Sequence, residues 1–191
     1  MIHLGLIVAS TREGRLGGRV AEWFTNLAGA RGDLAIDLID LAAIALPERL
    51  PAAHPARGGR APAVAPFAER VAAAEAFVIV TPEYNHGYPA ALKQALDLLH
   101  VEWRAKPVSF VSYGGVSGGV RAVEQLRQVA VELHMAPVRD AVVLPMARRL
   151  FADGAPADPD GRIAESVGAM LDRLVWWAEA LSAARRHRPY D

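Results

Sequence analysis

The chain has 191 residues, of which 52% are hydrophobic, and this is enough to bury one core of ordinary size. Its formal net charge is +0 at pH 7, so bulk charge predicts neither a nucleic-acid nor a membrane partner. The absence of cysteine excludes disulfides, thiolate metal sites and a cysteine nucleophile.

The beginning of the chain has the pattern of a structural element rather than that of a secretion signal. Residues 1–8 lack a basic region followed by an apolar stretch and a cleavage site, and they are typical of a first strand. No uninterrupted apolar run approaches the roughly 20 residues of a membrane span. We therefore expect a cytoplasmic protein with one domain over residues 1–191.

Short apolar runs recur along the chain, and most are continuous aliphatic and β-branched stretches rather than alternations. This pattern is typical of strands that are buried on both faces of a parallel sheet. Helical patterns separate the runs, so strand and helix alternate. The predicted strands are residues 2–8, 34–41, 77–80, 108–112 and 138–144, and the predicted helices are residues 18–30, 63–76, 90–100, 119–134 and 160–185.

This alternation predicts an α/β fold of three layers, in which a five-stranded parallel sheet has helices on both faces. The flavodoxin-like strand order 2-1-3-4-5 is the natural expectation. Residues 46–66, rich in proline, interrupt the pattern as a long connection, either a tolerated surface insertion or a flap beside the ligand edge. Asp158 or Asp160 is expected to cap the last helix.

The loop after the first strand has the residues of a phosphate site. Ser10 and Thr11 offer hydroxyl groups, and Arg12 and Arg15 offer guanidinium groups that bind phosphate oxygens in pairs. A helix follows, and its N-terminus adds unpaired backbone N–H groups. Gly17 permits a close approach of the backbone. The alternative is a plain polar turn with a serine or threonine cap.

The loop after the third strand is dense in turn formers and hydrogen-bonding groups. Pro82 fixes the backbone at the strand end, and Glu83, Tyr84 and Asn85 follow it. Such an array can lie along the edge of a planar heterocycle and bind its ring nitrogens and carbonyls. Alternatively, Tyr84 anchors the loop to the core. His86 has either a role in loop structure or one in proton relay.

A third loop, after the fourth strand, begins with Tyr113, Gly114 and Gly115. Glycine removes side chains where a ligand face approaches closely, and the N–H groups of Gly114 and Gly115 are candidates to bind a ring carbonyl. A flexible turn is the alternative. The histidines are scattered without metal-ligand spacing, so we expect no metal site.

Together the three loops resemble the NADPH-dependent FMN reductase family, a flavodoxin-like group that includes quinone, azo and chromate reductases. The resemblance rests on residues 10–15, 81–85 and 113–115 and covers nearly the whole chain. It implies that Ser10, Arg12 and Arg15 hold the FMN phosphate. It also implies that residues 82–85 and 113–115 border the flavin ring, and that the protein forms a homodimer or homotetramer.

The expected activity is hydride transfer from NADPH or NADH to FMN and then to a small-molecule acceptor such as a quinone or a flavin. The cofactor supplies this chemistry, so no catalytic side chain is expected. The alternatives are a flavodoxin-type electron carrier, which the net charge of +0 disfavours, and a flavin-free member of the fold. Arg57 and Arg60 are candidates for binding the 2′-phosphate of NADPH.

Overall fold

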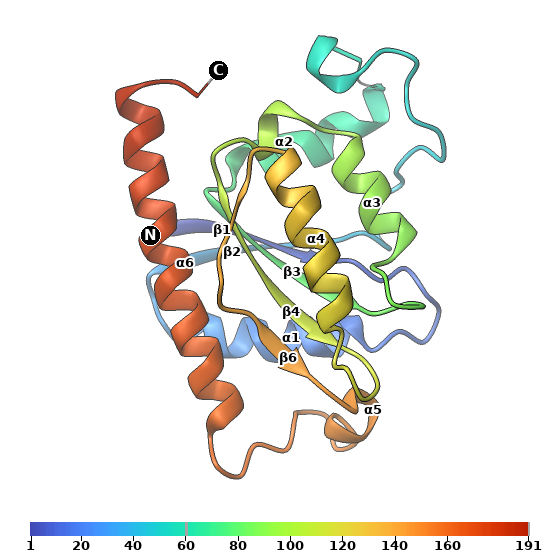
Figure 1. The fold of residues 1–191 in the computed structure, drawn as a ribbon, viewed down its shortest axis with the longest axis vertical. Helices are drawn as coiled ribbons and strands as arrows, with labels where there is room; N and C mark the ends of the chain where they lie inside the picture. The colour runs from blue at the N-terminus through green and yellow to red at the C-terminus, as the bar shows by residue number, and fades with distance from the viewer. Residues whose placement is uncertain (60, 191) are drawn as a thin grey trace.

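A computed structural model describes residues 1–59 and 61–190, and it shows a parallel sheet between two layers of helices (Figure 1). The sheet has the order β2-β1-β3-β4-β5, and β6 also pairs with β4. The predicted three-layer fold and its strand order are therefore confirmed. The strands are β1 (Ile2–Val8), β2 (Leu34–Asp40), β3 (Ala76–Pro82), β4 (Pro107–Tyr113), β5 (Ala136–Pro137) and β6 (Val142–Leu144). The helices are α1 (Gly17–Gly29), α2 (Ala65–Ala73), α3 (Ala90–Asp97), α4 (Val120–Glu132), α5 (Ala147–Leu150) and α6 (Arg162–His187).

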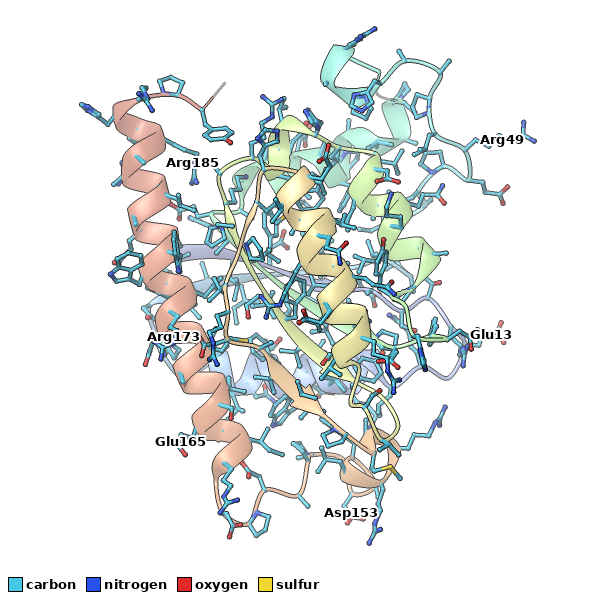
Figure 2. The ribbon with its side chains drawn as sticks, viewed as in Figure 1. Glu13, Arg49, Asp153, Glu165, Arg173 and Arg185 are labelled. Atoms are coloured by element: carbon cyan, nitrogen blue, oxygen red, sulfur yellow. The ribbon has the colours of Figure 1, made fainter. Side chains whose placement is uncertain are left out.

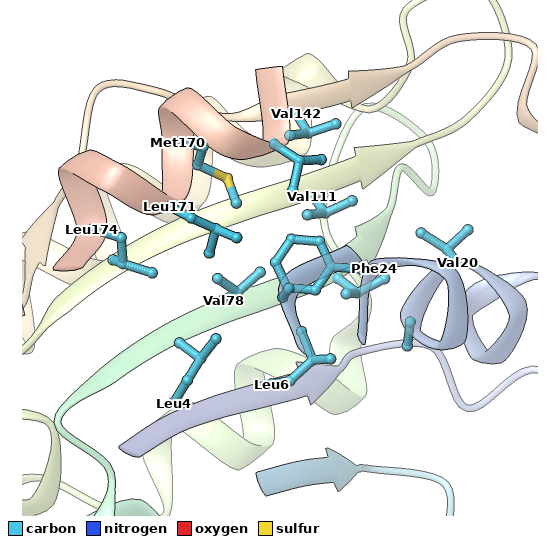
Figure 3. Close-up of a cluster of buried hydrophobic side chains, with 14 of the residues drawn as sticks. Leu4, Leu6, Val20, Phe24, Val78, Val111, Val142, Met170, Leu171 and Leu174 are labelled. Atoms are coloured by element: carbon cyan, nitrogen blue, oxygen red, sulfur yellow. The ribbon is translucent and has the colours of Figure 1, made fainter. Parts of the chain in front are cut away.

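Both faces of the sheet are covered, which explains the continuous apolar runs of the sequence. All residues of β3 and β4 are buried. One cluster packs β1, β3 and β4 against α1 and α6, and the other packs them against α2, α3 and α4. Figure 3 shows the first cluster, with Phe24 of α1 and Leu171 of α6 lying over Leu6 and Val78 of the sheet.

The fifth predicted strand, residues 138–144, is interrupted. Within this range only Val142–Leu144 form a strand, β6, and the two-residue strand β5 (Ala136–Pro137) comes just before the range; both are parallel to β4. Pro137 has no N–H for the ladder, and the Arg127 and Ser109 side chains donate to the carbonyl oxygens of residues 138–140, at 2.7, 2.8 and 2.6 Å. Side chains therefore satisfy backbone groups that a continuous strand would have paired.

Helices α2, α3 and α4 are shorter than predicted, and the first two show why. Helix α2 ends at Ala73 because Ala76 already pairs with Leu4 as the first residue of β3, whereas the prediction extended to residue 76. Helix α3 ends at Asp97, and the 3₁₀ turn Val101–Trp103 follows it. Apolar periodicity continues through such turns and so does not mark the end of a helix.

The proline-rich residues 46–66 contain two 3₁₀ turns, Pro55–Arg57 and Pro62–Val64. The Gln94 side-chain amide of α3 donates to the carbonyl oxygen of Pro47, which ties the start of the segment to the helix layer. Arg60 lies outside the described residues. No helix of the described residues is long and apolar enough to cross a membrane.

We predict that Asp158, and not Asp160, stabilises the start of α6. The Asp158 carboxylate accepts hydrogen bonds from the backbone N–H groups of Ile163 at 3.1 Å and Ala164 at 2.9 Å. Asp158→Ala is expected to lower the free energy of unfolding by about 0.5–2 kcal/mol in chemical denaturation. Asp160→Ala is the matched control and is expected to change it by less than about 0.5 kcal/mol. Equal losses in the two variants would contradict the assignment.

Candidate functional site

The register of the sheet brings the loops of the sequence analysis to one edge. Val8, the last residue of β1, pairs with Val80, and Pro82 at the end of β3 pairs with Tyr113 at the end of β4. Tyr113 in turn pairs with Leu144 at the end of β6. The loops after these four strands therefore leave the sheet side by side, at the carboxyl edge where parallel α/β sheets bind ligands.

A cavity of about 470 Å³ opens between these loops, and most predicted site residues line it. Thr11, Gly17 and Asn85 are the predicted residues that do not. Thr11 lines a smaller neighbouring cavity of about 190 Å³ together with Leu46 and Glu48. The predicted residues that line the main cavity are Ser10, Arg12, Arg15, Pro82, Glu83, Tyr84, Tyr113, Gly114 and Gly115.

The guanidinium group of Arg15 is occupied within the protein. Its two terminal nitrogens donate to both carboxylate oxygens of Asp40, at 2.6 and 2.5 Å, and one of them also donates to the carbonyl oxygen of Ser10 at 2.9 Å. The hydrogen bonds from Arg15 lower the pKa of Asp40 although burial opposes this. Arg15 therefore joins the end of β2 to the first loop, and its charge is matched by Asp40.

Arg12 has a different environment. Its guanidinium carbon lies 4.4 Å from the centre of the Tyr84 ring, in a cation–π contact, and the residue is exposed. The Tyr84 hydroxyl lies 2.6 Å from the hydroxyl oxygen of Ser10. These contacts connect the first loop to the second and hold the cation of Arg12 at the cavity. Within residues 1–59 and 61–190, Arg12 forms no ion pair with a carboxylate.

Helix α1 begins beside these residues with its N-terminus uncapped. The helix starts at Gly17. In the part of the chain that the structure describes, no side chain caps this end, and the first turn contains no acidic residue. Its first backbone N–H groups and the positive end of its dipole are suited to an anion. A Cβ atom on Gly17 would lie 2.7 Å from the Tyr113 hydroxyl, so glycine is required for this close approach.

The loop after β3 contains a tight hairpin. Tyr84 and Gly87 exchange two backbone hydrogen bonds, at 2.8 and 3.0 Å, across a two-residue turn. Asn85 and His86 form the turn, and both have positive φ, 51° and 69°. The side-chain amide of Gln125 donates to the carbonyl oxygen of His86 at 3.0 Å, which fixes the hairpin on α4.

Glu83 caps helix α4 from the neighbouring loop. One carboxylate oxygen accepts from the Ser117 hydroxyl at 3.1 Å and from the backbone N–H of Arg121 at 3.2 Å. The other pairs with the Arg121 guanidinium, and the Glu83 side chain is only 8% exposed. Burial raises the pKa of Glu83, but the hydrogen bonds from Arg121 and Ser117 outweigh it, so the net shift is downward.

Several backbone groups of the third loop form hydrogen bonds within the protein. The N–H of Gly114 donates to the carbonyl oxygen of Leu144 at 3.2 Å, so the expectation that this group is free for a ligand is wrong. The carbonyl oxygens of Gly115 and Gly114 accept from the N–H groups of Met146 at 2.7 Å and Ala147 at 2.9 Å. The pKa of Tyr113 is raised by burial and by Tyr84, so its phenol remains protonated at neutral pH.

Two further parts of the chain line the cavity and were missed in the sequence. Leu16 precedes α1, and residues 146–149 include the two arginines Arg148 and Arg149. A detectable signal existed, since residues 146–149 follow the fifth predicted strand and so belong to the same edge. Residues 146–149 contain no glycine, serine or threonine, so the sequence did not distinguish this segment from an ordinary turn.

A larger cavity lies away from these loops. It measures about 810 Å³, and Val120 and Arg127 of α4 line it with Val143 of β6 and Ala169 of α6. It follows the open edge of the sheet and contains none of the predicted site residues. Among the described residues, no group of three or more His, Cys, Asp or Glu side chains is arranged to hold a metal ion.

The strand order, the helix layers and the cavity at the carboxyl edge define a flavodoxin-like protein. The flavoenzyme NAD(P)H:(acceptor) oxidoreductase FerB of Paracoccus denitrificans has the same fold, with a TM-score of 0.73 and 22% identity over 94% of this chain and 98% of that one. A mutant flavodoxin of Pseudomonas aeruginosa matches with a TM-score of 0.55 and 19% identity over 88% of this chain and 99% of that one.

Sequence comparisons narrow this class. The family model described as NADPH-dependent FMN reductase matches residues 2–149, so the chain belongs to that family. An NAD(P)H-dependent FMN reductase of Nectria sp. is 32% identical over 94% of this chain and 89% of that protein. One of Saccharomyces cerevisiae is 36% identical over 70% of this chain and 76% of that protein. The match to one of Schizosaccharomyces pombe has 49% identity but spans 41% of this chain and 40% of that protein.

We predict that Glu83→Gln destabilises the protein. We also predict that the free energy of unfolding of this variant depends less on pH in the acid range. The variant loses the ion pair with Arg121, and we expect a loss of about 1–3 kcal/mol in the free energy of unfolding at pH 7. Because folding lowers the pKa of Glu83 below its ordinary 4.5, the wild-type contribution is complete above that pH and is lost as the pH falls through the folded-state pKa.

Urea denaturation between pH 3 and pH 7 measures this effect. The difference between wild type and Glu83→Gln is expected to shrink towards acid pH. Glu13→Gln is the control, because Figure 2 shows Glu13 on the outer side of the loop after β1, pointing away from the protein. A constant difference over the whole pH range would contradict the role of the Glu83 carboxylate.

Proposed function

We propose that this protein is an FMN-dependent NAD(P)H oxidoreductase that passes electrons to a quinone, a flavin or a similar acceptor. The observation that carries the proposal is the uncapped N-terminus of α1 beside Arg12, whose cation has no carboxylate partner among the described residues. Both lie at the edge of a cavity with an aromatic and glycine-lined wall. Membership of the NADPH-dependent FMN reductase family supports it. The curated relatives carry matching names, NAD(P)H-dependent FMN reductase in yeast and probable NADPH:quinone oxidoreductase in rice.

In this proposal the FMN phosphate lies at the N-terminus of α1. Arg12 and the hydroxyl of Ser10 bind it directly, and Thr11 lies on the far side of the same loop. Gly17 contributes indirectly, because its missing side chain lets the Tyr113 hydroxyl lie against the first turn of α1. Arg15 acts through Asp40, by holding the loop in the shape that Arg12 needs.

The flavin ring is assigned to the space between the second and third loops. Pro82, Glu83, Tyr84 and Asn85 border it on one side, and the turn 113–115 borders it on the other. Bound FMN supplies hydride acceptance and donation, so the protein needs no acid or base of its own. The residues of the chain bind the phosphate, orient the ring and keep one face of the ring open to the second substrate.

The main alternative is an electron carrier of the flavodoxin type, which the fold alone permits. Two observations weigh against it. The net charge is +0, whereas strongly charged surfaces favour fast docking between electron-transfer proteins. The curated relatives that cover most of this chain are named as reductases.

We also propose a homodimer or homotetramer in the cytoplasm. Exposed apolar side chains support association, since Val116 is 90% and Val131 is 62% exposed on the third loop and on α4. A monomer mass that stays constant with concentration in light scattering would refute the association.

We predict that substitutions of the two arginines of the first loop affect different properties, FMN binding for Arg12 and stability for Arg15. Arg12→Gln is expected to weaken FMN binding about tenfold to a hundredfold, because a charge-assisted contact with phosphate is lost, and to leave stability nearly unchanged. Arg15→Gln is expected to lower the free energy of unfolding by about 1–3 kcal/mol, because Asp40 loses its partner. Titration of FMN fluorescence and urea denaturation of both variants measure the two effects. Full FMN affinity in Arg12→Gln would contradict the phosphate assignment.

An absorbance experiment tests the function itself. The protein is reconstituted with FMN, desalted, and mixed with NADPH or NADH without oxygen. Retained flavin bands that bleach with either nucleotide support the reductase. Retained bands that neither nucleotide bleaches indicate an electron carrier, and failure to bind FMN at any concentration rejects the proposal.

A further inference from the structure

Residues 146–149 are held firmly at the rim of the cavity. The N–H groups of Met146 and Ala147 donate to the carbonyl oxygens of the third loop, at 2.7 and 2.9 Å. Behind them, the guanidinium of Arg19 donates to the carbonyl oxygen of Phe151, and the Phe151 ring packs edge-on against Trp23 with the ring centres 5.8 Å apart. The segment is therefore fixed both to the β4 loop and to α1, and its arginines are presented from an ordered backbone.

Arg148 and Arg149 line the cavity, and both are exposed to solvent at its rim. Neither forms an ion pair within the part of the chain that the structure describes. Asp153, the next carboxylate along the chain, lies in the turn beyond α5 (Figure 2). The two guanidinium groups are therefore uncompensated positive charge at the mouth of the site.

Arg148 and Arg149 are positive charges in excess of the carboxylates around the cavity. Asp40 is matched by Arg15, and Glu83 is matched by Arg121. A phosphate monoester carries about −1.5 to −2 charges at neutral pH. Arg12, with the roughly half positive charge at the N-terminus of α1, balances most of one such group. The pair at the rim is then sufficient for a second phosphate monoester, brought by a molecule that enters from solvent.

We propose that Arg148 and Arg149 bind the 2′-phosphate of NADPH and so make this protein select NADPH over NADH. The inference rests on the proposed reductase function, because it assigns a group of the electron donor of that reaction. Guanidinium groups bind phosphate oxygens in pairs, and NADH has only a hydroxyl at this position. The alternative source of the same chemistry is the 5′-phosphate of FMN itself, and the experiment distinguishes the two.

The experiment compares the wild type with the double variant Arg148→Gln/Arg149→Gln, each loaded with FMN. Calorimetry gives the Kd of NADP⁺ and of NAD⁺, fluorescence titration gives the Kd of FMN, and steady-state assays give kcat/KM for NADPH and NADH. We expect NADP⁺ affinity and kcat/KM for NADPH to fall roughly tenfold to a hundredfold. NAD⁺ affinity, kcat/KM for NADH and the Kd of FMN are expected to change less than about threefold.

Arg57→Gln is the matched control. Arg57 is also exposed and was a candidate for the same phosphate from the sequence, but it lies in the turn Pro55–Arg57 and does not line the cavity. Its variant is expected to keep the preference for NADPH. Loss of that preference in Arg57→Gln alone would overturn the proposal.

Three other outcomes would overturn it. The first is an equal loss for both nucleotides in the double variant, and the second is no loss for either. The third is weaker FMN binding with an unchanged ratio between the nucleotides, which would assign the arginines to the flavin phosphate.

A binding comparison on the wild type does not depend on the variants. The protein is expected to bind 2′-AMP more tightly than 5′-AMP. Equal affinities would overturn the inference even if the double variant failed to fold, and the single variants provide the same readouts in that case. A wild type that takes up no FMN rejects the reductase function, whereas one that takes up FMN and binds both nucleotides equally rejects only this inference.

Discussion

At the carboxyl edge of the sheet, two carboxylates form ion pairs with arginines of the protein itself, and the rest of the site depends on these two pairs. Asp40 holds Arg15 and Glu83 holds Arg121, so each buried or half-buried carboxylate is satisfied by the protein's own arginine. An unpaired carboxylate at the same place would repel a phosphate. Because both are neutralised, the remaining cations and the first turn of α1 present a positive surface to a ligand.

The two ion pairs also give the site its rigidity. Arg15 ties the first loop to the end of β2, and Glu83 ties the second loop to the start of α4. Strands β3 and β4 beneath them are buried throughout. A binding site on such supports needs little reordering when a ligand enters, which lowers the entropic cost of binding. This arrangement suits a protein that holds a cofactor by many weak contacts and leaves the chemistry to it.

The sequence was sufficient for the fold and for most of the lining of the candidate cavity because both depend on local patterns. Continuous apolar runs marked the buried strands, and the loops after them were recognisable from glycine, proline and hydroxyl residues. The partner of Arg15 was not recognisable, because Asp40 is brought to it by the pairing of β1 with β2 across a long interval of sequence. The same holds for Glu83 and Arg121. The break between β5 and β6 was missed because Arg127 reaches that backbone from another helix.

The most direct test of the account is a crystal structure of the protein with FMN bound. We predict that the phosphate lies at the N-terminus of α1 against Arg12 and Ser10, while the ion pair between Arg15 and Asp40 remains closed. A phosphate bound by Arg15 after it has left Asp40 would contradict the account, and so would a flavin in the cavity between α4 and α6.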